Sequence, residues 1–203
     1  MRRVVLAVAA TGMLAAASCS SSKAGVTAVG PTVATAPETT TTTDPYAIPP
    51  VIDVAYVNRV LAGLDAAVGD VVRFVVKTHP APHEITLRLK PLYNDRALAA
   101  QLEFFHQDAA ENYKGYRSDP ANEKSSTLEV IAASSRCIFA RVTRDYQPVS
   151  ANPDVQLSEQ WVGLIPLTPE RDPNHVNTTG WSYVYDGFQE PHNPPPNPCG
   201  VSS

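Results

Sequence analysis

The residues of this chain that are suited to acid or base chemistry fall into two short groups. One group lies within and just after a helical pattern, and the other closes a predicted strand. A carboxylate or imidazole whose pKa suits the working pH can abstract a proton, and a neighbouring tyrosine hydroxyl can stabilise the resulting enolate. Each residue also has an ordinary structural interpretation as helix surface, turn or core edge, so the sequence assigns no catalytic residue. The candidates are His106, Asp108, Tyr113 and Tyr116 in the first group, and Asp145 and Tyr146 in the second.

Motifs for other reaction classes are absent from the sequence. The chain contains no GxSxG, GxxxxGK[ST], HExxH or GxGxxG pattern. His83 and Glu84 begin like a zinc motif, but Leu87 stands where the second histidine is required. No metal and no cofactor is therefore predicted. These absences favour a protein without catalytic activity, and an isomerase or cyclase with an Asp or His base stays open as an alternative.

Three aromatic residues alternate along a predicted strand near the C-terminus. Trp181, Tyr183 and Tyr185 are two positions apart, and alternation in a strand puts such residues on one face. If that face is concave, the residues line a pocket for an apolar or glycan ligand, with His106 as a further lining residue. If it is the core face, they pack there as ordinary core residues. The sequence leaves both interpretations open.

The cysteine count indicates a disulfide. Once Cys19 is set aside, Cys137 and Cys199 remain as an even pair, and such pairs bond in oxidising compartments. Closing a loop of about 63 residues stabilises a fold by roughly 4 kcal/mol in the chain-entropy model. Two unpaired thiols are the alternative.

The N-terminus is typical of an export signal. Residues 1–18 combine Arg2 and Arg3 with an apolar run that is too short to span a bilayer with confidence. The run followed by Cys19 resembles a bacterial lipoprotein signal peptide. That resemblance implies an acylated, palmitate-bearing Cys19 and a protein anchored at the extracytoplasmic face of the cell membrane. The lipoprotein box usually has leucine where this chain has Ala16, which leaves ordinary secretion as the alternative.

Composition divides the remaining chain into a tether, one domain and a tail. Residues 19–50 are rich in Ser, Thr and Pro and form a flexible tether with a typical span of roughly 30 Å. The domain covers residues 51–190, and the proline-rich tail covers residues 191–203. The formal net charge of the 203-residue chain is −4, so nucleic acid is excluded as a partner on charge.

Helices are predicted in the first half of the domain. Apolar residues recur every three or four positions from Val54 to Val75, with Asp53 as N-cap and His79-Pro80 as the end. A helical stretch over 83–89 follows. A third stretch begins with Asn94 or Asp95 as its cap, and Gly115 closes it. A coiled coil is an alternative for the first helix, but packing on a sheet is favoured because the heptads are few. The apolar face of the third helix is Leu98, Leu102, Phe105 and Ala109.

Strands are predicted after a polar stretch over 118–126. Four segments are rich in β-branched and aromatic residues and are bounded by turn residues. Ser134-Ser135 is predicted to form a tight hairpin between the first two. Arg136, Arg141 and Arg144 are predicted to form a solvated basic face, with a membrane-surface contact as the alternative. The segments are 127–133, 136–146, 155–167 and 181–188.

The order of elements predicts an α+β fold, with N-terminal helices packed on a four-stranded, curved antiparallel sheet. Over roughly residues 51–190 this order resembles the cone-shaped fold of nuclear transport factor 2, ketosteroid isomerase and the polyketide cyclases. The segment 137–146 is similar to secreted actinobacterial lipoproteins of unknown function. Together these features predict a membrane-anchored interaction or assembly module of the bacterial envelope, with an envelope protein or a second copy as partner. A small-molecule binder that uses the cone's pocket is the alternative.

Overall fold

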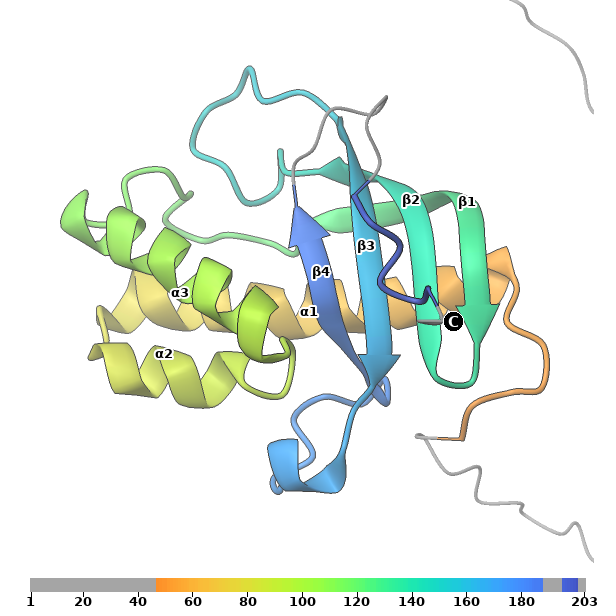
Figure 1. Ribbon diagram of the computed structural model, residues 1–203. Helices are drawn as coiled ribbons and strands as arrows, with labels where there is room; N and C mark the ends of the chain where they lie inside the picture. Colours follow the sequence, from red (N-terminus) through yellow and green to blue (C-terminus); the bar gives the residue numbers. More distant parts are fainter. Residues whose placement is uncertain (1–46, 188–194, 201–203) are drawn as a thin grey trace, which may run out of the picture. The chain divides into compact units, whose positions relative to one another are not determined.

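The computed structural model describes residues 47–187 and 195–200 (Figure 1). The predicted signal segment, Cys19, most of the predicted tether and most of the predicted tail lie outside the described residues. Within the described part of the chain, no helix combines the length and apolar character needed to cross a membrane.

Three helices precede the sheet. Helix α1 (Val54–Thr78) begins where Oδ1 of Asp53 accepts a hydrogen bond from the backbone N–H of Tyr56 at 2.7 Å, which confirms Asp53 as the N-cap. It ends at His79, whose left-handed φ of 48° closes the last turn. Helix α2 (Pro82–Leu89) and helix α3 (Asp95–Ala110) follow.

Helix α3 is shorter than the sequence pattern predicts. It ends at Ala110 because the next residues leave helical geometry: Asn112 and Tyr113 have φ values of 61° and 55°. The backbone N–H of Tyr113 then donates to the carbonyl of Asp108 at 2.8 Å. The prediction that Gly115 closes the helix is wrong, and Ala109, predicted on the apolar face, is exposed.

The sheet is an antiparallel meander of four strands. Strands β1 (Lys124–Ser134), β2 (Cys137–Asp145), β3 (Ser158–Pro166) and β4 (Trp181–Gly187) are neighbours in the order of the sequence. The prediction of three helices on a four-stranded antiparallel sheet is confirmed. The two-residue turn between β1 and β2 is Ser135-Arg136, one position later than predicted. A 3₁₀ turn, Pro169–Arg171, lies between β3 and β4.

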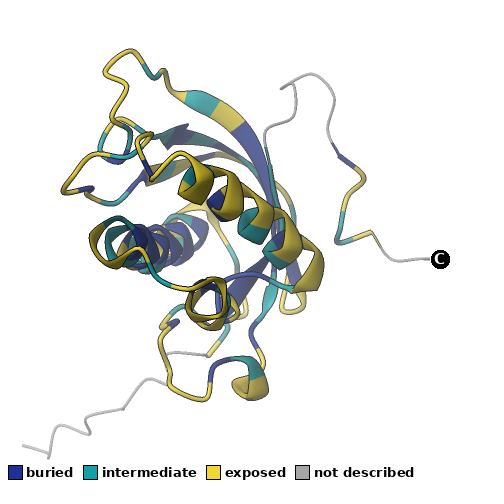
Figure 2. Ribbon diagram, turned by 90° about the vertical axis from the view of Figure 1, so that its left-hand side faces the viewer, coloured by how far each residue is buried: buried dark blue, intermediate teal, exposed yellow. Residues whose placement is uncertain are grey.

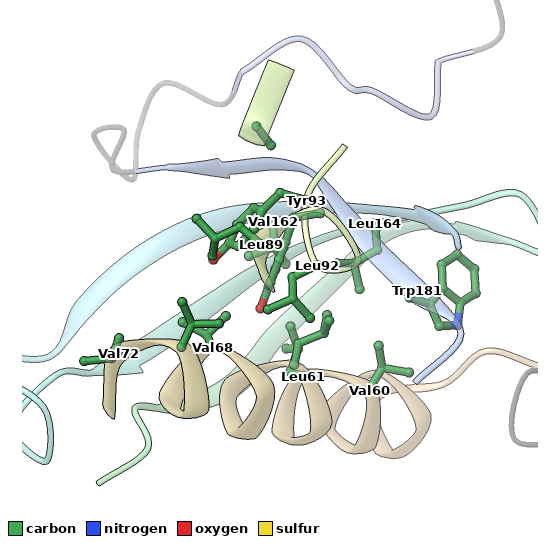
Figure 3. Close-up of a cluster of buried hydrophobic side chains, with 14 of the residues drawn as sticks. Val60, Leu61, Val68, Val72, Leu89, Leu92, Tyr93, Val162, Leu164 and Trp181 are labelled. Carbon is green, nitrogen blue, oxygen red and sulfur yellow. The ribbon is translucent and has the colours of Figure 1, made fainter. Parts of the chain in front are cut away.

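The sheet has one face towards the helices, here called the helical face. Alternate residues of β3, Val162 and Leu164, are fully buried on this face and belong to one core with Leu61 of α1 (Figure 3). Complete burial of one such aliphatic side chain stabilises a fold by roughly 1.5–3 kcal/mol. The core therefore fixes α1 against the sheet.

The opposite face of the sheet, here called the outer face, meets the C-terminal segment (Figure 2). Phe139 and Trp161 stack on this face with ring centroids 5.4 Å apart. The structure joins Cys137 to Cys199 in a disulfide, as the cysteine count predicts, with Cα atoms 5.4 Å apart. Residues 195–200 are held over the outer face by this bond.

Candidate functional site

A cavity of about 460 Å³ lies between helix α3, helix α1 and the helical face of the sheet. Ligand sites in proteins commonly measure 300–1,000 Å³ and have mostly apolar walls. Two valines of α1 and two phenylalanines of α3 supply part of the wall, and the loop after β2 supplies more. The aliphatic and phenylalanine residues of the lining are Val68, Val72, Ala100, Phe104, Phe105, Val149 and Val155.

Helix α3 presents its lining residues at helical spacing. Positions 100, 101, 104, 105 and 108 all face the cavity, as residues three or four apart on one side of a helix do. The helix is held at its N-terminus, where the backbone N–H of Asn94 donates to the carbonyl of Tyr183 at 2.7 Å. The N–H of Tyr183 donates in turn to the carbonyl of Leu92 at 2.8 Å. These two bonds tie the start of α3 to β4.

An acid and a tyrosine meet at the side of the cavity. The hydroxyl of Tyr116 donates to Oδ2 of Asp108 at 2.7 Å, and both residues line the cavity. Burial raises the pKa of Asp108, and the hydrogen bond from Tyr116 opposes the rise. Burial also raises the pKa of Tyr116 well above its usual range, with the Asp108 carboxylate adding to the effect. The tyrosine is therefore the proton donor of this pair.

A buried arginine stands at the polar end of the cavity. Arg144 of β2 is 2% exposed, and its guanidinium contacts two carboxylates. Nη1 lies 3.1 Å from Oε1 of Glu123, and Nη2 lies 2.9 Å from Oδ1 of Asp186 on β4. Nη2 also donates to the hydroxyl of Tyr183 at 3.0 Å. Residues from the segment just before β1, from β2 and from β4 thus meet in one charged cluster.

Asp65 of α1 adds a further carboxylate behind this cluster. Its Oδ2 accepts from the backbone N–H of Ser125 at 2.7 Å, and its Oδ1 accepts from the hydroxyl of Ser125 at 2.9 Å. Asp65 is 3% exposed. The group therefore holds the three carboxylates of Asp65, Glu123 and Asp186 against one guanidinium, and a buried charge is costly unless it is compensated.

Glu123 is the member of this group whose pKa is raised into the neutral range. Burial raises the pKa of Glu123 to about 7; Arg144 opposes the rise, while Asp65 and Asp186 add to it. Burial also raises the pKa of Asp186 and of Asp65 against the opposing effect of Arg144. A carboxyl that titrates near neutral pH at the edge of a cavity can accept or donate a proton there.

Tyr146 and Gln160 form a neutral polar pair in the lining. Nε2 of Gln160 donates to the hydroxyl oxygen of Tyr146 at 2.9 Å. Burial raises the pKa of Tyr146 to about 12, with Arg144 opposing. The phenol therefore keeps its proton at physiological pH.

The acid and base candidates predicted from sequence separate in the structure. Asp108, Tyr116 and Tyr146 line the cavity together, whereas Asp145 is not among its lining residues. Tyr113 is buried beside His79, with ring centroids 5.3 Å apart.

The aromatic pocket predicted from β4 is not the cavity of the structure. Trp181 and Tyr183 are fully buried in the core, which is the second of the two interpretations that alternation allows. Tyr185 lies on the other side of the strand because the ladder skips one residue: Tyr183 pairs with Leu164, and Tyr185 pairs with the adjacent residue, Gly163. The prediction that all three share a face is therefore wrong.

His106 also lies outside the cavity. It is exposed on α3, whereas its neighbours at 104, 105 and 108 line the cavity. The aromatic part of the lining instead comes from Tyr93, Phe104, Phe105, Tyr116 and Tyr146.

The prediction of a solvated basic face on β2 is wrong for Arg144, which is buried and paired. Its side chain continues the alternation of Ala140 and Val142 on the helical face, so period-2 alternation could have identified it as a buried charge. Glu123 was missed because it lies in the polar stretch before β1. Nothing in that stretch distinguishes it from its exposed neighbours.

No group of three or more His, Cys, Asp or Glu side chains suited to a metal ion occurs among residues 47–187 and 195–200. The side chains of the site can supply hydrogen bonding, charge pairing and proton transfer. Comparisons of the chain with family models, with curated proteins and with solved structures give no match.

Proposed function

We propose that this chain is a small-molecule-binding protein of the bacterial cell envelope, with its ligand in the cavity beside α3. The observation that carries this proposal is the cavity of about 460 Å³, which joins apolar walls to a buried charged cluster. A lined space of this size is the feature expected of a ligand site.

The arrangement of elements supports a cone-like fold of the nuclear transport factor 2 type. Three helices lie against a meander, and the space between them opens beside α3 rather than at the centre of the core. Register shifts in β1 at Leu128 and Ile131, and in β4 at Val184, bend and twist the outer strands of the sheet. Such bending separates part of a sheet from the helix that covers it.

The proposed location rests on the N-terminal sequence. Acylation at Cys19 and the tether over 19–50 would hold the domain within reach of the membrane surface. Labelling with palmitate is expected for the wild type and is expected to disappear in Cys19→Ala. An interaction or assembly role for the anchored domain, and its pairing with a second copy, stay predictions.

Native mass spectrometry of the domain purified from its own envelope tests the binding function. The wild type is expected to retain a small molecule, and the variant Gly115→Trp is expected to lose it. Gly115 lines the cavity, and a Cβ at this position would meet no heavy atom within 4 Å, so a larger side chain can enter the cavity without displacing backbone. An equal amount of bound molecule in both proteins would contradict the proposal.

An isomerase or cyclase activity is the second candidate, and the contact between Asp108 and Tyr116 favours it. The Asp108 carboxylate can take a proton from carbon, and the Tyr116 hydroxyl, which donates to Asp108 at 2.7 Å, can turn to donate to the developing enolate oxygen instead. The ligand released from the purified domain, incubated in D₂O with fresh protein, is then expected to take up deuterium at carbon. Asp108→Asn should abolish this exchange. If the ligand also stays unlabelled with the wild-type protein, the catalytic candidate is wrong and binding is the function that remains.

A further inference from the structure

We propose that the cavity selects ligands with a cationic nitrogen head and an apolar body, that is, amphipathic amines, and that Glu123 binds the head. This inference rests on the proposed binding function and specifies its ligand class. It depends on the charged groups in the lining and on how many of their hydrogen-bonding atoms are already engaged.

Arg144 is engaged by the protein itself. Nη1 contacts Glu123 and donates to Oδ2 of Asp186 at 3.3 Å, while Nη2 contacts Oδ1 of Asp186 and donates to Tyr183. Both terminal nitrogens of the guanidinium are therefore committed. The Nε atom is buried and has no hydrogen-bond partner among the described residues, but one N–H cannot form the two-donor fork that recognises a carboxylate or phosphate. Arg144 serves to hold its two carboxylates in place rather than to bind a carboxylate or phosphate ligand.

The lining carries an excess of negative charge. Among the described residues that line the cavity, Asp108, Glu123 and Asp186 are acidic, and Arg144 supplies the basic group. A field of this sign attracts a cation and repels an anionic head.

Glu123 is the carboxylate with capacity left to bind a ligand. Its Oε1 faces Arg144, whereas no hydrogen bond or ion pair to another described residue involves Oε2. The residue is 8% exposed and lines the cavity. Oδ2 of Asp186 accepts from Arg144, and its Oδ1 forms only an ion pair with Arg144 and is too buried to meet a ligand. Asp108 accepts from Tyr116. An ammonium group beside Glu123 would satisfy this atom and offset the surplus charge.

An amine fits this cavity better than a metal ion does. The described residues contain no cluster of three or more metal-ligating side chains, and hard cations need several oxygen ligands. The valine and phenylalanine walls instead suit an alkyl or aromatic body.

The charged surroundings of Glu123 make the proposed binding dependent on pH. Burial raises the pKa of Glu123 most; Arg144 on β2 opposes the rise, and Asp65 on α1 and Asp186 on β4 add to it. Tyr93 and Tyr183 complete the cluster and stay protonated because burial raises their pKa values. Because Glu123 gains its proton as pH falls through about 7, affinity for an ammonium is expected to drop roughly tenfold between pH 8 and pH 6.

Isothermal titration calorimetry with decylammonium, decanol and decanoate tests the head group while the body is held constant. At pH 8 the wild type is expected to bind decylammonium at least tenfold more tightly than decanol, and decanoate least tightly. In Glu123→Gln this preference should fall to about threefold or less, with decanol affinity unchanged. Glu129→Gln, which removes an exposed carboxyl on β1, should behave as the wild type.

Three outcomes would overturn the inference. Decanol or decanoate binding as tightly as decylammonium would refute the head-group preference, while ligand retained in native mass spectrometry would still support the cavity function. If decylammonium still binds to Gly115→Trp, in which the cavity is filled, the amine binds to the acidic surface of the protein and not in the cavity. Affinity for decylammonium that does not change between pH 6 and pH 8 would exclude Glu123 without any substitution, so the test holds even if Glu123→Gln fails to fold.

Discussion

Arg144 is the residue whose loss should cost the fold most among its charged side chains. It pairs with Glu123 and Asp186 and is 2% exposed. Removing one member of a buried ion group leaves the other charges uncompensated, which costs roughly 3–5 kcal/mol. We expect Arg144→Met to lower the free energy of unfolding in urea by about this amount. The matched change Arg141→Met, on the same strand, should cost less than about 1 kcal/mol because its ion pairs are exposed.

Glu123 should make stability depend on pH in a defined window. Its pKa is about 7 in the folded chain against an ordinary value of 4.5, so between these values the folded chain holds a proton that the unfolded chain has released. The free energy of unfolding therefore falls as pH rises through this window.

From pH 5 to pH 8 the wild type is expected to lose about 2–3 kcal/mol more than Glu123→Gln does. Urea unfolding at both pH values measures the difference. The raised pKa values of Asp65 and Asp186 change stability with pH in the same direction, but both residues are present in the wild type and in the variant, so their effect cancels in the comparison. Parallel profiles for wild type and variant would show that Glu123 is ionised throughout.

The buried charges were only partly predictable from the sequence. Asp65 lies between Leu64 and Val68 on the apolar stripe of α1, and Arg144 follows Val142 at the spacing of a strand. A charge that interrupts an apolar period is a signal of a buried ion group. Glu123 interrupts no period, and its role arises only from the fold that brings β1, β2 and β4 together.

At the scale of elements, Gly63 shows how tertiary contact reverses a local preference. Glycine weakens a helix by up to about 1 kcal/mol relative to alanine, so Gly63→Ala would stabilise an isolated α1. In the structure a Cβ at this position would lie 2.5 Å from Cγ2 of Thr179. The hydroxyl of Thr179 donates to Asn177 at 2.7 Å and accepts from the N–H of Trp181 at 3.1 Å, so this side chain cannot turn away without breaking both bonds.

We therefore expect Gly63→Ala to lower the free energy of unfolding by about 1 kcal/mol or more. Gly115→Ala is the control, because a Cβ there meets nothing within 4 Å, and it should change stability by less than about 0.5 kcal/mol. Thermal unfolding of the two variants decides the matter. A gain in stability for Gly63→Ala would contradict this prediction, because it would mean that the loop at Thr179 moves to accommodate the added Cβ at little energetic cost.

Helix and strand positions followed from the sequence, whereas the register of the strands did not. The apolar period of α1 and the N-cap at Asp53 were sufficient to predict this helix, because the sequence pattern of a helix depends on residues close together in the chain. The skipped residues Leu128, Ile131 and Val184 depend on cross-strand packing, which a single strand does not reveal. For this reason the side of Tyr185 was mispredicted.

At the scale of the whole domain, helices followed by a meander were enough to predict the α+β class. The cavity was not predictable, because its size depends on where α3 stands relative to the sheet. That position is set by backbone hydrogen bonds between Leu92, Asn94 and Tyr183, which join segments about 90 residues apart in sequence. Contacts of this kind leave no periodic signal in either segment.

The disulfide is the bond expected to secure the C-terminal segment on the outer face. Cys137 and Cys199 are separated by 62 positions, and closing such a loop restricts the unfolded chain by about 4 kcal/mol in the chain-entropy model. The double variant Cys137→Ser/Cys199→Ser is expected to lose an amount of this order in urea unfolding, with the m-value raised because its unfolded chain exposes more surface.

Thiol titration under denaturing, non-reducing conditions supplies the control for that result, since the wild type should show no free thiol from either cysteine. Two titratable thiols would contradict the bond itself. A double variant as stable as the oxidised wild type would instead show that Pro198, which packs against Gly163 on β3, holds the segment without help. Ligand affinity should stay within about twofold of wild type in either case, because the cavity lies on the helical face and the disulfide on the outer face.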